Sequence, residues 1–277
     1  RSVTDPAGHR WIMNEPLPGS LLRGKDGAYF AGIFDVAHDH GLHTAFFGGK
    51  IKFSLFDRTW DGEHGSPDTT GPDDGRDKLD AFFLSGAQNH ITDAALEDLE
   101  GGFARSLVFV HYPGPDGAGH RFGWNLTADS PYMQSVAAVD KELGRILAAI
   151  GSDPALKGRT ALLLTADHGG GGPFQSHYDV RLWVNYVIPF LVWAGKDAPP
   201  ADLYELNPAA RRDPGLSNPA TGTSRPPPIR NGEIGNLGSS SWVCRPCPAP
   251  RWAPATISCC RPRPQQVPAT ATSLEHA

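Results

Sequence analysis

Two kinds of hydrophobic pattern alternate along the 277-residue chain. Continuous apolar runs of strand length occur at 106–112, 160–165 and 187–193. The clearest amphipathic pattern covers 131–150, where apolar residues recur at helical spacing until Gly151 ends it. Continuous apolar strands that alternate with helices are typical of a parallel sheet covered on both faces. The pattern therefore predicts an α/β fold with a mostly parallel central sheet and helices on both faces.

Shorter elements are predicted between and before these runs. Residues 30–41 read as a helix that ends at its glycine, and 42–47 as a strand that follows it. Residues 57–90 are rich in Asp, Gly and Pro and have weak periodicity, so we expect a long surface excursion there. A short helix is expected over 92–99. The Pro- and Gly-rich segment before the long amphipathic helix is expected to be a loop.

The composition of the chain changes abruptly near its end. Residues 229–237 look like the start of a last helix, whereas 238–277 are Pro, Arg, Cys and Ser without an apolar period. We therefore expect one incomplete domain over 1–237 and a disordered or frameshifted tail beyond it. The nucleotide sequence near Gly238 would test the frameshift hypothesis. All four cysteines lie in this tail, at Cys244, Cys247, Cys259 and Cys260. The crowded prolines around them argue against a zinc site there.

Charge and hydropathy exclude several classes of partner. The formal net charge is −5, and no cluster of Lys and Arg marks a nucleic-acid-binding surface. No run approaches the ~20 apolar residues that span a bilayer, so we expect no membrane segment. The first residues lack the signal-peptide pattern. A periplasmic or secreted location would follow if a signal peptide had preceded this N-terminus, and the sequence leaves compartment and oligomeric state open.

Candidate metal ligands follow two of the predicted strands. Asp116 and His120 come after the first, four residues apart, with small residues between them. Asp167 and His168 end the second and open a run of four glycines, and His177 lies nine residues beyond His168. Ligands of an open α/β sheet bind outside the carboxyl ends of the strands, so the two groups are expected to converge. Five carboxylate and imidazole ligands exceed the needs of one tetrahedral zinc. We therefore predict two divalent ions, which can clamp both oxygens of an in-line displacement at phosphorus.

Each of these motifs also has an ordinary structural interpretation. Taken alone, Asp116 and His120 are more simply explained as structural residues. For Asp167 and His168 the glycines that follow favour a functional interpretation, because glycine lets backbone and ligand approach closely. Lys50, after two glycines, is interpreted as a solvated turn lysine, with approach to a substrate anion as the alternative.

The motifs resemble the alkaline phosphatase superfamily, most closely its type I phosphodiesterase/nucleotide pyrophosphatase branch. The similar segments are 109–124, which contains Asp-x-x-x-His, then Leu-Thr-Ala-Asp-His-Gly-Gly and Ser-His-Tyr-Asp. The resemblance extends from about residue 30 to residue 237. It implies an alkaline-phosphatase-like sandwich and a metal-dependent phosphoric ester hydrolase. The implied substrates are small phosphate esters, in particular phosphodiesters or pyrophosphate-linked nucleotides.

The resemblance also implies roles for individual residues. Asp116, His120 and His177 would hold one zinc ion, and Asp167 and His168 would hold the other. The family's first metal-binding Asp and its Thr or Ser nucleophile precede the helix at residue 30, and we interpret the similar-looking segment from Thr4 to His9 as a decoy. We therefore expect the nucleophile to be missing from this chain and its turnover to be lost or very weak.

Two alternative functions remain open. A sulfatase-like hydrolase is possible within the superfamily, but the Cys-x-Pro-x-Arg motif that sulfatases convert to formylglycine is absent. The alternative from another class is a non-catalytic, metal-binding fragment of the fold. Hydrolysis of a p-nitrophenyl phosphodiester with added zinc would separate these hypotheses.

Overall fold

The computed structural model describes residues 19–24, 26–71, 73, 75–171, 175–195, 200–217 and 226–242. Its elements in chain order are α1 (Ile33–Asp39), β1 (His43–Gly48), η1 (Ile51–Phe53), α2 (Ser54–Thr59), β2 (Ala81–Leu84), α3 (Gln88–Leu99), β3 (Ser106–His111), α4 (Gly114–Phe122), α5 (Pro131–Ser152), β4 (Leu162–Thr165), η2 (Trp183–Asn185), β5 (Phe190–Trp193), α6 (Leu203–Leu206) and α7 (Glu233–Trp242).

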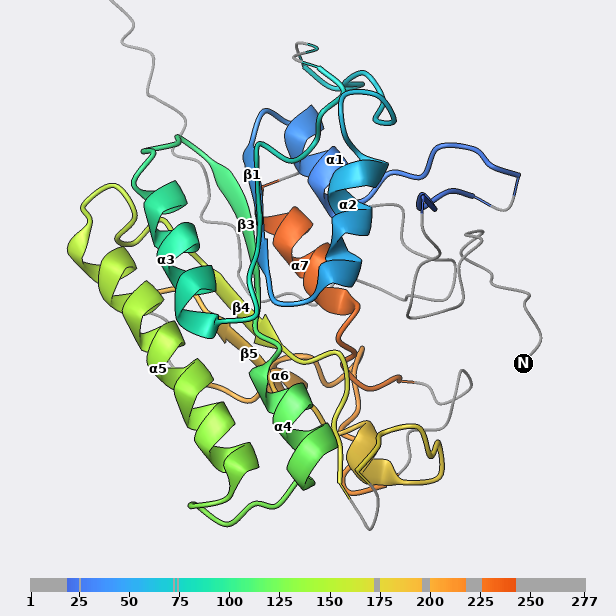
Figure 1. The fold of residues 1–277 in the computed structure, drawn as a ribbon, viewed down its shortest axis with the longest axis vertical. Coiled ribbons are helices and arrows are strands. Elements are labelled where there is room, and N and C mark those ends of the chain that lie inside the picture. Colours follow the sequence, from blue (N-terminus) through green and yellow to red (C-terminus); the bar gives the residue numbers. More distant parts are fainter. Residues whose placement is uncertain are drawn as a thin grey trace, which may run out of the picture.

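The described strands form two sheets. Strands β2, β1 and β3 lie in that order and are parallel, whereas β4 and β5 form an antiparallel pair. Helices α3 and α5 lie on one side of the strands, and α1, α2 and α7 lie on the other (Figure 1). The predicted α/β fold with helices on both faces is therefore confirmed. The run 187–193 does contain a strand, but it pairs antiparallel, because it returns to β4 without a helical crossover.

Strand β1 is buried on both faces. On one face Phe46 is fully buried, and its ring packs against the rings of Phe34 on α1 and Phe56 on α2. On the other face Phe47 belongs to a buried cluster with Ile91 of α3. Successive side chains of a strand point to opposite faces, so a strand covered by helices on both sides needs apolar residues at every position. This explains the uninterrupted apolar run.

The Pro- and Gly-rich segment after β3 is a helix, so the expectation of a loop there was wrong. Helix α4 starts at Gly114, directly after Pro113, and ends where Gly123 adopts a positive φ of 81°. Proline is tolerated in the first turn of a helix because the N–H groups there have no partner within the helix. The consequence for function is that Asp116 and His120 are four residues apart on one helix and therefore share a face.

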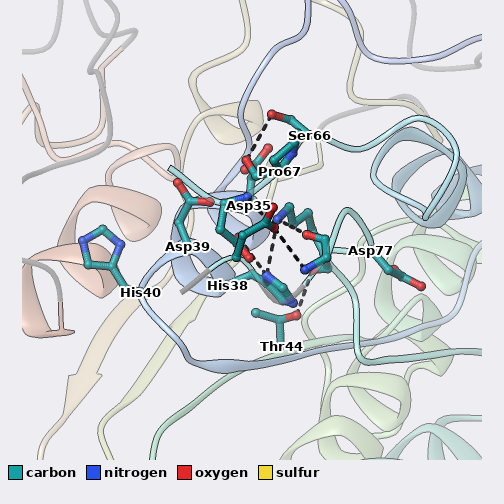
Figure 2. A network of polar contacts seen from close by, with 12 residues as sticks. Asp35, His38, Asp39, His40, Thr44, Ser66, Pro67 and Asp77 are labelled. Carbon is teal, nitrogen blue, oxygen red and sulfur yellow. Dashed lines mark hydrogen bonds and ion pairs between the residues drawn. The ribbon is translucent and has the colours of Figure 1, made fainter. Parts of the chain in front are cut away.

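The segment 57–90 is also more ordered than expected. It contains β2 and the first residues of α3, and the irregular part before β2 is anchored in the interior. Lys78 is fully buried, and its Nζ donates to Asp68 Oδ1 at 2.5 Å and to Gly75 O at 2.7 Å. His38 of α1 lies 3.1 Å from the same Asp68 oxygen. Figure 2 shows this polar network around His38 and Thr44, at the amino end of β1.

The last described helix extends past the composition change near Gly238. Helix α7 runs to Trp242, and Leu237, Gly238 and Ser239 are buried. It packs against α1 and β4. The first residues of the segment expected to form a tail are therefore helical. The four cysteines lie outside the described residues, as does the segment from Thr4 to His9. Among the described helices, none is both long enough and apolar enough to cross a membrane.

Candidate metal centre

Asp116 lies at the centre of the site, in the first turn of α4. One of its carboxylate oxygens, Oδ2, accepts a hydrogen bond of 2.6 Å from Lys50 Nζ. The other oxygen, Oδ1, is buried and makes no hydrogen bond. Leaving a buried acceptor without a partner costs about 1–3 kcal/mol, and more for a charged group, so such atoms need an explanation. A bound cation would satisfy this oxygen.

Three imidazoles surround the unbonded oxygen. The Nε2 atoms of His120, His168 and His177 lie 3.3, 3.7 and 4.0 Å from Asp116 Oδ1. The rings of His168 and His177 are stacked, with centroids 3.5 Å apart. Within the part of the chain that the structure describes, Asp116, His168 and His177 form a group of three whose ligand atoms lie within 4.8 Å of one another. The predicted convergence of the two loops is thus visible in the geometry.

This group of three differs from the ligand sets that were predicted for the two ions. The resemblance implied Asp116, His120 and His177 for one ion, whereas the tightest group of three replaces His120 by His168. His120 remains next to Asp116, on the same helix face. Asp167 is the most exposed of the five, with 71% of its side chain accessible, and its Oδ2 lies 3.5 Å from His168 Nε2. The assignment of each residue to one or the other ion stays a prediction.

Backbone carbonyl groups orient two of the histidines. His120 Nδ1 lies 2.9 Å from Gln175 O, and His168 Nδ1 lies 2.8 Å from Gly169 O. A carbonyl oxygen can only accept, so each Nδ1 is assigned as the N–H donor, which leaves the Nε2 lone pair directed at the cluster. Histidines that bind metals in proteins are generally held by such a second hydrogen bond.

The local charges favour the ligand forms of these side chains. Burial opposes ionisation of Asp116, but the hydrogen bond and the charge of Lys50 outweigh it and lower the pKa of the carboxyl. Burial, and then the neighbouring His168, lowers the pKa of His177. Metal ligands must be deprotonated carboxylates and neutral imidazoles, so both shifts favour the protonation states that bind a metal. The donor set of one carboxylate and several imidazoles fits zinc or a similar divalent transition metal.

Four residues of the site were not recognised from the sequence as part of it. Lys50 was expected to be solvated, but it is only 29% exposed and pairs with Asp116. His111 ends β3 and accepts from Gly49 N–H at 3.4 Å. Trp124 approaches both loops, since its ring lies against Gly119 and Gly170. Asn231, before α7, donates to the backbone oxygen of Asp167 at 2.7 Å. All four contacts join segments far apart in the chain, which periodicity cannot reveal.

The glycine after His168 is required by its surroundings. A Cβ at Gly169 would lie 2.1 Å from Val184 O and 2.5 Å from Val187 O, and both obstacles are backbone atoms. Gly169 N–H also donates to Asn185 O at 3.0 Å. We expect Gly169→Ala to lower the free energy of unfolding by at least about 2 kcal/mol, because the loop must move away from η2. Urea denaturation measures this change.

The matched control for this prediction is Gly144→Ala in α5. A Cβ at Gly144 would meet nothing within 4 Å, so the change is expected to stabilise the protein by about 0.5–1 kcal/mol through helix propensity alone. If Gly169→Ala proved as stable as the wild type, the close packing of the loop on η2 would be wrong.

The fold and the site together define a class of protein. It is an α/β protein in which Asp and His side chains gather in the segments that follow the carboxyl ends of β3 and β4, a position typical of ligand sites in such sheets. The family model described as type I phosphodiesterase / nucleotide pyrophosphatase matches residues 5–185, a range that contains all five predicted ligands. The chain therefore belongs to the type I phosphodiesterase/nucleotide pyrophosphatase family.

Among curated proteins, a 2,3-bisphosphoglycerate-independent phosphoglycerate mutase of Roseobacter denitrificans is similar to part of this chain. The two are 35% identical over 101 residues, which cover 33% of this chain and 17% of the mutase. The chain thus corresponds to about a sixth of the length of that relative. No solved structure matches the chain.

Proposed function

We propose that this chain is a metal-dependent phosphoric ester hydrolase of the phosphodiesterase type, whose substrates are phosphodiesters or pyrophosphate-linked nucleotides. The observation that carries the proposal is the buried, unbonded Oδ1 of Asp116, which faces the Nε2 atoms of three histidines. Membership of a family described as phosphodiesterases and nucleotide pyrophosphatases supports the substrate class. The relative that matches part of the chain, a phosphoglycerate mutase, also acts on a phosphate ester.

In this proposal, the residues of the candidate metal centre have different roles. Asp116, His168 and His177 hold a divalent ion, with His120 and Asp167 beside them as ligands of a second. Zinc in such a site polarises a phosphoryl oxygen and lowers the pKa of a bound water or hydroxyl. The carbonyl groups of Gln175 and Gly169 keep two imidazoles in the ligand tautomer. The stacked rings of His168 and His177 hold the two imidazoles against each other beside Asp116.

We also propose that the hydrolysis catalysed by residues 1–277 is slow. No Thr or Ser of the described residues is assigned as the nucleophile of the family, and the expected metal-binding Asp of the first strand is likewise unassigned. Metal and substrate can still bind without the nucleophile, since the candidate ligands that follow β3 and β4 are present.

The test is hydrolysis of bis(p-nitrophenyl) phosphate by the full chain, first treated with a chelator and then supplied with zinc. We expect slow hydrolysis that depends on added zinc, and no hydrolysis of p-nitrophenyl sulfate. Faster cleavage of the sulfate would favour the sulfatase-like alternative, and zinc binding without any turnover would favour the non-catalytic fragment. Rapid phosphodiester turnover would refute the hypothesis that the nucleophile is missing.

A further inference from the structure

Lys50 places a positive charge beside the proposed metal ligands but is not itself one of them. It lies two residues after the end of β1, and its ammonium lies 2.6 Å from Asp116 Oδ2, while the other oxygen of the same carboxylate faces the histidines. The two side chains are 29% and 21% exposed, so water screens this pair only in part. One oxygen of the Asp116 carboxylate therefore pairs with Lys50, and the other is available to a metal ion.

The backbone before Lys50 is held in place by the loop after β3. Gly48 is paired in register with His111 across the parallel sheet, and Gly49 N–H donates to His111 Nδ1 at 3.4 Å. A Cβ at Gly49 would lie 2.2 Å from the ring of Pro113, so the glycine is pressed against that ring. The turn therefore fixes where the Lys50 side chain starts, and the lysine does not reach Asp116 by chance.

His111 can accept the hydrogen bond from Gly49 at neutral pH. Burial, and then the charge of Lys50, lowers the pKa of its imidazole to about 4. The ring is therefore neutral, with Nδ1 unprotonated, in the range where most proteins are stable. The imidazole also packs against the ring of Phe53 on η1 in a T-shaped arrangement, which further restricts its orientation.

We propose that Lys50 is a second, fixed cation of the metal centre. It lowers the affinity of the site for divalent metal, and it binds a phosphate oxygen of the substrate beside the metal. The inference rests on the proposed function and assigns a residue to the same site. An ammonium and a divalent ion on the two oxygens of one carboxylate repel each other strongly in a half-buried site. A phosphate group carries more than one charged oxygen, so it can bridge the two cations and relieve that repulsion.

A purely structural role for Lys50 predicts the opposite effect on metal binding. If the lysine only held Asp116 in the right rotamer, removing it would loosen the carboxylate and weaken metal binding or leave it unchanged. If the lysine repels the metal, removing it frees Oδ2 and strengthens metal binding. The sign of the change therefore separates the two roles, without any measurement of turnover.

The experiment is isothermal titration of zinc into the chelator-treated full chain and its variants. For Lys50→Met we expect zinc affinity to rise by about tenfold or more, because a charge in contact with the ligand carboxylate is removed. Lys50→Arg keeps the charge and is expected to stay within about twofold of the wild type. Lys141→Met, at an exposed position of α5, is the matched control and is expected to leave zinc affinity unchanged.

A second titration adds inorganic phosphate to the zinc-loaded proteins. Lys50→Met is expected to weaken phosphate binding by about tenfold, since one of the two cations is lost. Unchanged or weaker zinc binding by Lys50→Met, or unchanged phosphate binding, would overturn the inference while leaving the metal centre intact. A wild-type chain that bound no zinc would refute the metal centre itself, and this inference with it.

Discussion

Replacement of Asp116 by asparagine will lower the affinity of the chain for zinc by at least about 100-fold and abolish zinc-dependent phosphodiester hydrolysis. The amide keeps the size of the side chain but removes the negative charge on Oδ1, the buried oxygen that has no hydrogen-bond partner. It also leaves three imidazoles without the anion they surround. Zinc titration of the variant measures the loss directly, and thermal unfolding with and without zinc provides a second readout.

The control is Asp140→Asn, at an exposed position of α5. It removes the same charge from the protein but not from the site, so zinc affinity should not change. If Asp116→Asn bound zinc as tightly as the wild type, Asp116 would not be a ligand and the proposed centre would be wrong.

The histidines around Asp116 allow the division between ions to be tested in the same assay. If the group of Asp116, His168 and His177 holds the tighter ion, His168→Ala and His177→Ala will reduce zinc affinity more than His120→Ala. If instead the division implied by the family resemblance is right, His120→Ala will cost as much as His177→Ala. The number of zinc ions bound per chain, read from the same titrations, distinguishes one ion from two.

The second large effect is expected far from the site, at the buried ion pair of Lys78 and Asp68. Lys78→Met is expected to lower the free energy of unfolding by about 3–5 kcal/mol, because it leaves a buried carboxylate without its ammonium partner. Lys78 is fully buried, and the Asp68 side chain is 1% exposed, so water cannot replace the lost contact. Urea denaturation followed by far-UV circular dichroism measures the change.

A double-mutant cycle separates the loss of the ion pair from the loss of packing. Asp68→Asn combined with Lys78→Met should cost less than the sum of the single changes, since Asp68→Asn removes the buried negative charge that Lys78 neutralises. Lys141→Met, at an exposed position of α5, is the matched control and should stay within about 0.5 kcal/mol of the wild type. A Lys78→Met protein that unfolded within about 1 kcal/mol of the wild type would show that the network contributes little.

The sequence predicted the parts of the fold and site that depend on local patterns. The apolar runs located β1, β3, β4 and β5. For β1, burial on both faces explains the run, since such a strand needs apolar residues on both sides. The positions of Asp116 and His168 just after strands were enough to predict that their loops meet at one edge of the sheet. The proximity of the candidate ligand residues was therefore predictable from their chemistry and their order along the chain, and their role as ligands stays a prediction.

Other features depend on contacts between distant residues, and local patterns could not reveal them. Helix α4 was missed because its prolines and glycines have low helix propensity, although proline is acceptable in a first turn. The four-residue β2 was hidden in a polar segment. Lys78 lies in the segment that was expected to be a surface excursion. Its burial depends on an ion pair with Asp68, ten positions away. Lys50 and Asp116 are 66 positions apart, so no periodicity connects them.

The ligands of the candidate metal centre come from both sheets. Asp116 and His120 follow the three-stranded parallel sheet, whereas His168 follows the antiparallel pair. Trp124 packs against Gly119 of the first half and Gly170 of the second. An ion bound here would add a direct link between the segments that follow the two sheets. Metal binding and the mutual alignment of the two sheets would then be thermodynamically coupled, so removal of the ion would also weaken the contact between the segments that carry its ligands.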